Sequence, residues 1–144
     1  METQHGESDS WAVLSLRQVP TAARHARAAM SSVLVRLGLG RQFRADAELV
    51  LNELVANAVE HGSADREGMI EAAWRLTPDR LVLRVRDSGK AARLEPGTLE
   101  HGHGGPNVRG RGLAIVDAVS SAWSYEVGLD GTEVTAVLMR GDHS

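Results

Sequence analysis

The chain has 144 residues, of which 42% are hydrophobic and 24% charged, and it contains no cysteine. This length and mixture are typical of one globular domain with one core, and the absence of cysteine excludes disulfide bonds and thiol catalysis. A formal net charge of −3 provides no basic field for nucleic acid, and no apolar run approaches the roughly 18 residues of a membrane span. We therefore expect a cytoplasmic protein that binds neither nucleic acid nor membrane.

The first half of the chain predicts a strand followed by two helices. Residues 11–17 (WAVLSLR) predict the strand, and Pro20 begins a helix that runs to about Leu37. Residues 41–61 predict a second helix, because their apolar side chains recur with helical spacing. Gly62 follows this helix, and we expect it to end the helix in the left-handed conformation that glycine adopts easily.

The polar edge of the second predicted helix carries the first candidate site residues. At about 100° per residue, Glu53, Asn57 and His61 share an edge beside the apolar face. Glu53 is suited to polarise an attacking hydroxyl, and Asn57 offers a neutral oxygen to Mg²⁺, which prefers hard oxygen ligands. A histidine in the last turn of a helix also suits the helix dipole. A solvated helix flank is the alternative interpretation of this edge.

Two strands are predicted next, at about 69–77 and 80–87, with Pro78-Asp79 between them. Leucine and valine alternate with polar residues along the second strand, so one of its faces should be buried. Asp87 and Gly89 stand where this strand ends. An aspartate there can accept a hydrogen bond from an exocyclic amine such as that of adenine. The alternative is a plain turn, because Asp-Ser-Gly is common turn chemistry.

A glycine-rich run over residues 91–109 separates this strand from the next predicted helix, which spans 110–122. The run is long for a connection inside a domain, and it predicts a structureless lid or a disordered segment. Gly110 and Gly112 stand at the start of the helix, before Leu113. Glycines there let backbone N–H groups approach a ligand closely, and the free N–H groups and the helix dipole favour phosphate.

The remaining residues predict a closing hairpin, with strands at about 123–129 and 133–140 around the turn at Asp130-Gly131. Because most strands occur in hairpins, we expect an α+β fold. Its architecture should be a two-layer α/β sandwich with a mixed, mostly antiparallel sheet and the helices on one face. The single domain should span residues 11–140, and residues 1–10 and 141–144 should fray.

In this order, the three motifs resemble those of the GHKL (Bergerat-fold) ATPase superfamily. The short chain is most similar to the anti-sigma-factor serine/threonine kinases of the histidine-kinase-like ATPase type. The matching residues are Glu53, Asn57 and His61 for the N box, Asp87 and Gly89 for the first glycine box, and Gly110, Gly112 and Leu113 for the second. The resemblance covers nearly the whole chain and implies ATP and Mg²⁺ as cofactors.

The resemblance also implies a role for each group. Asp87 would accept a hydrogen bond from adenine, Asn57 would hold Mg²⁺, and Glu53 would orient or deprotonate the attacking hydroxyl. The backbone of the second glycine box, with Arg109 or Arg111, would neutralise phosphate charge. The implied partners are an anti-anti-sigma (STAS-type) protein, which is phosphorylated, and a sigma factor, which is sequestered. The resemblance suggests a homodimer.

One position departs from the family pattern. The first glycine box usually reads Asp-x-Gly-x-Gly, whereas this chain has Ala91 in place of the second glycine. Alanine does not take a positive φ cheaply, so either the backbone there stays in an ordinary region or the lid is hinged differently and nucleotide affinity suffers. The neighbouring Lys90, the only lysine in the chain, either reaches a phosphate or is an exposed turn residue.

The missing glycine keeps two other functions open. The chain could be a nucleotide-binding regulatory module that binds a partner without phosphorylating it. It could instead be an interaction domain with a decayed site, which the intact Glu53, Asn57, Asp87 and Gly112 argue against.

Overall fold

The structure is a computed structural model that describes residues 10–88, 97–100, 112–128 and 131–141. Its helices and strands follow the predicted order closely. They are β1 (Ala12–Arg17), α1 (Ala22–Arg36), α2 (Arg41–His61), β2 (Met69–Leu76), β3 (Arg80–Asp87), β4 (Gly97–Glu100), α3 (Gly112–Val119), β5 (Ala122–Gly128) and β6 (Gly131–Met139).

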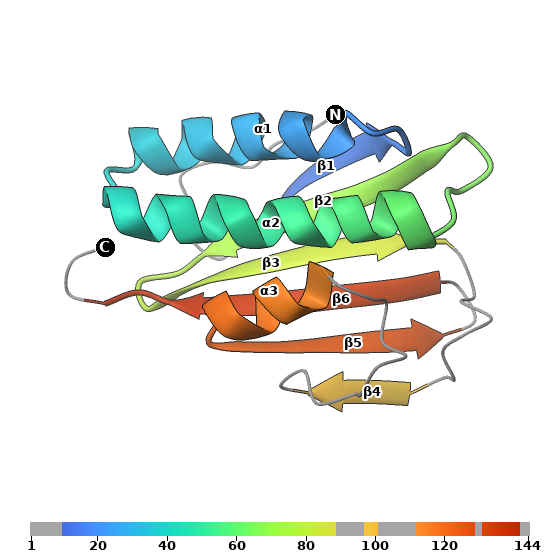
Figure 1. Cartoon of the computed structure of the whole chain (residues 1–144). Helices are drawn as coiled ribbons and strands as arrows, with labels where there is room; N and C mark the ends of the chain where they lie inside the picture. Colours follow the sequence, from blue (N-terminus) through green and yellow to red (C-terminus); the bar gives the residue numbers. More distant parts are fainter. Residues whose placement is uncertain (1–9, 89–96, 101–111, 129–130, 142–144) are drawn as a thin grey trace.

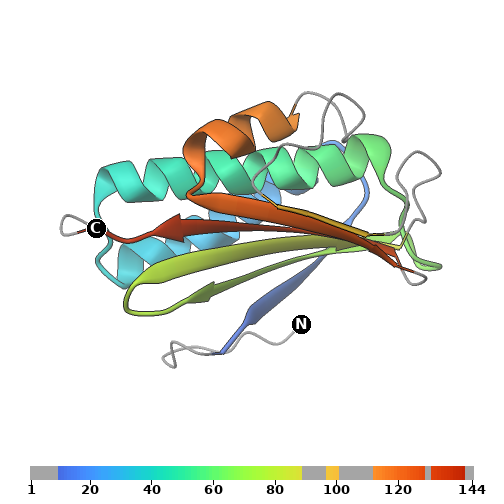
Figure 2. The same cartoon turned by 90° about the horizontal axis from the view of Figure 1, so that it is seen from below.

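The strands form one six-stranded sheet in the order β1-β2-β3-β6-β5-β4, and every pairing among the described residues is antiparallel. The three labelled helices lie on the same face of this sheet (Figure 1). In the view from below, no helix of the described residues covers the opposite face (Figure 2). The predicted two-layer α+β sandwich is therefore confirmed.

Side-chain alternation in β3 determines which residues meet the helices. Leu81, Leu83 and Val85 are buried and belong to the core cluster, whereas Arg86 is exposed. Since side chains alternate with a period of two, Asp87 falls in the same buried row as the three apolar residues. The hydrophobic pattern of this strand therefore carries a carboxylate to the helix side of the sheet, at the strand's last residue.

Helix α2 lies between α1 and α3 and packs on β3 (Figure 1). Its buried residues are mostly aliphatic, and the apolar ones between Ala47 and Ala58 all belong to the hydrophobic core. The facing helix α1 contributes small side chains, among them Ala22 and Ala26, which allow the two helices to approach closely. This packing holds the polar edge of α2 in a defined position above the sheet.

A fourth strand, β4, lies inside the run that we expected to be structureless. Residues 97–100 pair with β5 at the edge of the sheet, with Gly97 opposite Val127 and Glu100 opposite Ser124. The prediction is therefore wrong for these four residues, and the rest of the run lies outside the described residues. The cause is not local, because the open edge of β5 supplies the hydrogen-bonding groups.

Candidate functional site

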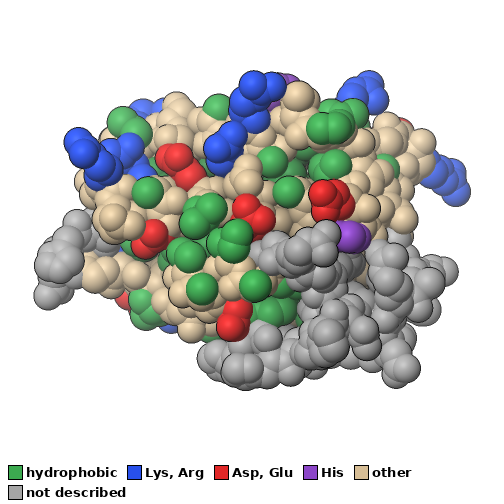
Figure 3. Space-filling model, in the orientation of Figure 1, with side chains coloured by type: hydrophobic (Ala, Val, Ile, Leu, Met, Phe, Trp, Pro, Cys, Tyr) green, Lys and Arg blue, Asp and Glu red, His purple; other side chains and the backbone are tan. Residues whose placement is uncertain are grey.

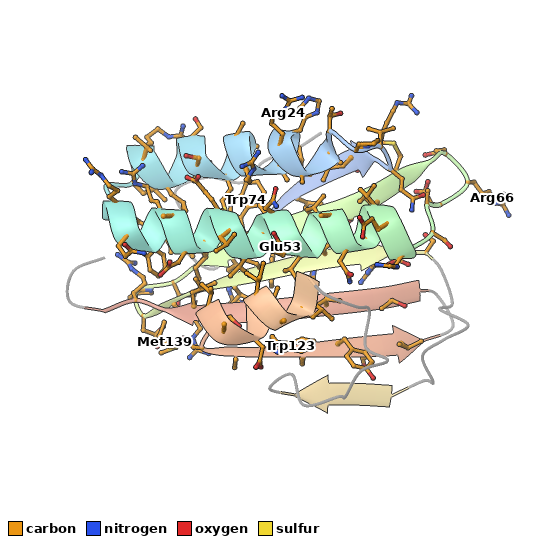
Figure 4. The ribbon with its side chains drawn as sticks, viewed as in Figure 1. Arg24, Glu53, Arg66, Trp74, Trp123 and Met139 are labelled. Carbon is orange, nitrogen blue, oxygen red and sulfur yellow. The ribbon has the colours of Figure 1, made fainter. Side chains whose placement is uncertain are left out.

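The polar edge of α2 is buried at one residue and partly open at the others. Asn57 is 5% exposed, whereas Glu53 and His61 are partly buried. Asn52 donates to a Glu53 carboxylate oxygen, with 3.2 Å between Nδ2 and Oε2, and His61 Nε2 lies 3.3 Å from Glu60 Oε1. Glu53 lies near the middle of α2, above α3 in the view of Figure 4. A solvated flank does not describe Asn57, because burying an amide is costly unless it serves a contact.

Asp87 stands at the end of β3 and is only 4% exposed. The backbone N–H of Ser63 donates to Asp87 Oδ1 at 3.4 Å. In turn, the N–H of Ser88 donates to the carbonyl oxygen of Ser63 at 2.8 Å. These two hydrogen bonds join the end of β3 to the segment that follows α2. The structure thus brings Asp87 to the C-terminal end of the helix that carries Asn57, although the two lie 30 positions apart in the sequence.

Gly62 ends α2 in a way that the sequence did not predict. Its φ of −90° and ψ of −174° are extended, so the expected left-handed stop is wrong. Space explains this glycine instead. A Cβ at position 62 would lie 2.5 Å from Asp87 Oδ2 and 2.7 Å from the carbonyl oxygen of Ala58. Glycine is required here because the Asp87 carboxylate occupies the volume that any side chain would need.

Two residues of β6 complete the surroundings of Asp87, and our sequence reasoning missed both. Thr132 pairs with Asp87 across the β3–β6 ladder and is 1% exposed. Gly131 has a φ of +145°, and a Cβ there would collide with the carbonyl oxygen of Asp87. The alternation of Val134 with the buried residues that follow it places position 132 on the helix side, so that pattern could have found the threonine.

The second glycine box is described only from its last two members. Gly112 is the first residue of α3, and Leu113 is buried in the core cluster. The N-terminal end of α3 lies toward the C-terminal half of α2 (Figure 1). Free backbone N–H groups at such an end favour an anion. Five predicted site residues lie outside the described residues, namely Gly89, Lys90, Arg109, Gly110 and Arg111.

The described residues fit a Mg²⁺ ion that is shared between the protein and the phosphates of a nucleotide. Within the described part of the chain, no group of three or more His, Cys, Asp or Glu side chains could hold a metal ion. Mg²⁺ is commonly held by one or two protein oxygens together with substrate phosphates and water. A single carboxamide oxygen at Asn57, buried near the helix end, fits that mode of binding.

Among the described residues, no helix is long and apolar enough to cross a membrane.

Comparison with known proteins agrees with this geometry. Residues 16–138 match the sequence model of the histidine kinase-like ATPase domain. The fold is similar to a crystal structure of the RsbU and RsbW domains of Rv1364c from Mycobacterium tuberculosis, with a TM-score of 0.67 and 25% identity. The similarity covers 90% of this chain and 31% of that one, so this chain spans about a third of its neighbour's length. The predicted resemblance to GHKL ATPases and to their anti-sigma-factor kinases is confirmed. Because the match runs through all of the described site residues, this protein belongs to the histidine kinase-like ATPase family.

Proposed function

We propose that the protein is an ATP-dependent serine kinase of the anti-sigma-factor type in a bacterial partner-switching system. It would phosphorylate an anti-anti-sigma protein and sequester a sigma factor, with residues 11–140 acting as one ATP-binding domain. The observation that carries the proposal is the meeting of the buried Asp87 carboxylate with the end of α2. The same helix bears Asn57 and Glu53 on one edge.

The spacing along α2 supports one order of ligand groups. At a rise of 1.5 Å per residue, Asn57 lies about 7.5 Å and Glu53 about 13.5 Å along the axis from Gly62, where Asp87 makes its contact. Asp87 accepts a hydrogen bond from the amine of adenine, with the buried Thr132 beside it. Asn57 would hold Mg²⁺, which would neutralise phosphate charge when bound. In this arrangement the adenine lies at the C-terminal end of α2, and the phosphates lie farther toward its N-terminus.

The phosphates reach the start of α3 in this arrangement. The backbone N–H of Gly112 faces them. Gly110 would add a further backbone N–H donor, and Arg109 and Arg111 would add positive charge. Glycine at position 112 permits the close backbone approach that a side chain would hinder. Leu113 packs this end of α3 into the core, which keeps the N–H groups in place. Gly89 would belong to the first glycine box of this site, and Lys90 beside it would add positive charge if it reaches a phosphate.

The transfer itself needs a base near the last phosphate. Glu53 is only partly buried, so a hydroxyl from another protein can reach it. The serine oxygen bonds to the γ-phosphorus, its proton passes to the Glu53 carboxylate, and the bond to the bridging oxygen of ADP breaks. His61 lies at the other end of the same edge, next to the adenine position, where it contacts the nucleotide rather than the serine.

The helix face also offers surface for a protein partner. Hydrophobic side chains gather over α2 and α3 on the face seen in Figure 3. Among the large exposed hydrophobic side chains are Leu49 of α2, 40% exposed, and Ile115 of α3, 37% exposed. Leu49 precedes Glu53 by one helical turn, so a partner that covers Leu49 brings its own residues near the proposed base.

These exposed side chains suit a second function as well, an ATP-binding regulatory module that acts by protein contact alone. The two functions are separated by calorimetric titration with Mg-ATP, followed by transfer of labelled γ-phosphate to candidate anti-anti-sigma proteins from the same genome. Binding with transfer to a serine supports the kinase. Binding without transfer to any candidate favours the regulatory module, and Ala91 is then the first position to restore to glycine. Absence of ATP binding would refute both.

A further inference from the structure

The side chain of Gln18 makes three long-range hydrogen bonds to the end of α2. The residue follows β1 and is partly buried. Its amide nitrogen Nε2 lies 3.2 Å from the carbonyl oxygens of both Ala58 and Val59 and 2.9 Å from that of Gly62. The backbone N–H of Gln18 donates to the carbonyl oxygen of Gly68 at 3.0 Å, which fixes the start of the side chain.

These contacts supply donors where α2 lacks them. The last four carbonyl groups of a helix have no partner within the helix, and they need donors from elsewhere. At the end of α2 the N–H of Gly62 reaches only the carbonyl of Ala58, at 2.9 Å, and the extended backbone of Gly62 forms no left-handed cap. The Gln18 amide therefore serves as the cap, and its shortest hydrogen bond holds the residue at which the chain leaves the helix.

Residues 62 and 63 connect this cap directly to Asp87. Gly62 touches the Asp87 carboxylate so closely that no Cβ fits between them. Ser63 donates its N–H to that carboxylate and accepts from the N–H of Ser88. Because Gly62 and Ser63 both lie against the Asp87 carboxylate, a shift of the Gly62 carbonyl would move both residues. The route from Gln18 to Asp87 thus consists of two described contacts, through one short segment.

We propose that Gln18 is a positioning residue for purine recognition: by fixing the end of α2 it sets the orientation of the Asp87 carboxylate toward the base. The proposal rests on the proposed function, in which Asp87 accepts from the exocyclic amine of adenine. Gln18 does not touch the nucleotide. Its loss should therefore weaken discrimination between bases more than it weakens contacts to the phosphates.

The test compares Gln18→Met, which keeps the length of the side chain without its donor, with Arg44→Met as a matched control. Arg44 Nε donates to the carbonyl of Leu39 at 3.0 Å, so this control removes a side-chain-to-backbone hydrogen bond at the opposite end of α2. Calorimetry gives the dissociation constants for Mg-ATP and for Mg-ITP, which has an oxygen in place of the adenine amine. If Gln18→Met does not fold, Gln18→Asn withdraws the amide by one methylene and takes its place.

We expect Gln18→Met to weaken ATP binding by between about threefold and tenfold, the effect of one lost hydrogen bond, and ITP binding much less. The preference for ATP over ITP then narrows, whereas Arg44→Met keeps the wild-type preference. Amide hydrogen exchange at Ser63 and Ser88 should speed up in Gln18→Met alone. That readout does not depend on nucleotide.

Three results are decisive. An unchanged ATP-to-ITP ratio in a Gln18→Met variant that still binds ATP would overturn this proposal and leave the proposed function intact. Unchanged exchange at Ser63 and Ser88 would overturn the capping role. A wild-type protein that binds no ATP, or binds ATP and ITP equally, would overturn the proposed role of Asp87 and this proposal with it.

Discussion

Replacing Gly62 with alanine tests whether space for Asp87 is the reason for glycine at the end of α2. The backbone at Gly62 is extended, so alanine adopts it without strain and would even stabilise the protein by about 0.4–1 kcal/mol through the unfolded chain. The added methyl meets Asp87 Oδ2 at 2.5 Å, Asp87 Cγ at 2.7 Å and the Ala58 carbonyl oxygen at 2.7 Å. Overpacking of this kind costs about 1–3 kcal/mol, which outweighs the entropic gain. We expect a net destabilisation of roughly 1–2 kcal/mol by difference.

The carboxylate must also move to admit the methyl, so ATP affinity should fall by about tenfold or more, the equivalent of one hydrogen bond to a charged group. Denaturant unfolding measures the stability, and calorimetric titration with Mg-ATP measures the affinity. Gly128→Ala is the matched control, because a Cβ at position 128 meets nothing within 4 Å. A Gly62→Ala protein with the affinity and stability of the Gly128→Ala control would refute the reasoning.

Four further predictions follow from the site and from one surface turn. Asp87→Ala should abolish measurable ATP binding in a protein that circular dichroism shows to be folded; retained affinity would remove its role at the base. Asn57→Ala should weaken ATP chiefly when magnesium is present, and equal losses in chelator would make Asn57 a structural residue. Glu53→Ala should bind ATP normally but transfer phosphate to the serine about 10² to 10⁴ times more slowly in single-turnover assays; an unchanged rate would leave the base unassigned. The Asp79 carboxyl should titrate by NMR with a pKa below its ordinary value of 3.8, because the Thr77 hydroxyl donates to this carboxyl and Arg80 lies beside it. The stabilisation from this turn is then complete above the ordinary pKa and is lost as the pH falls through the lowered pKa; a midpoint at 3.8 or above would contradict it.

The amino-acid sequence alone determined the helix that carries the site and the strand that ends at Asp87. Residues 41–61 form α2 with the predicted bounds, because a helical period over 21 residues is a strong local signal. Residues 80–87 form β3 as predicted, because leucine and valine alternate there. These two periods also place Glu53 and Asn57 on one edge, and Asp87 at the end of a half-buried strand. All of that information lies within single segments of the chain.

Tertiary structure decided what those segments meet. Strand β4 forms because the edge of β5 is open to it, and the sequence of residues 97–100 does not by itself predict this pairing. Gly62 is explained by a carboxylate 25 positions away, not by its own backbone conformation. Thr132 meets the end of β3, and Gln18 meets the end of α2. In each case the two partners are more than 40 positions apart in the sequence. A periodic pattern encodes which face of an element is buried, whereas the identity of the neighbour on that face arises only when the layers pack and their polar groups must be satisfied together.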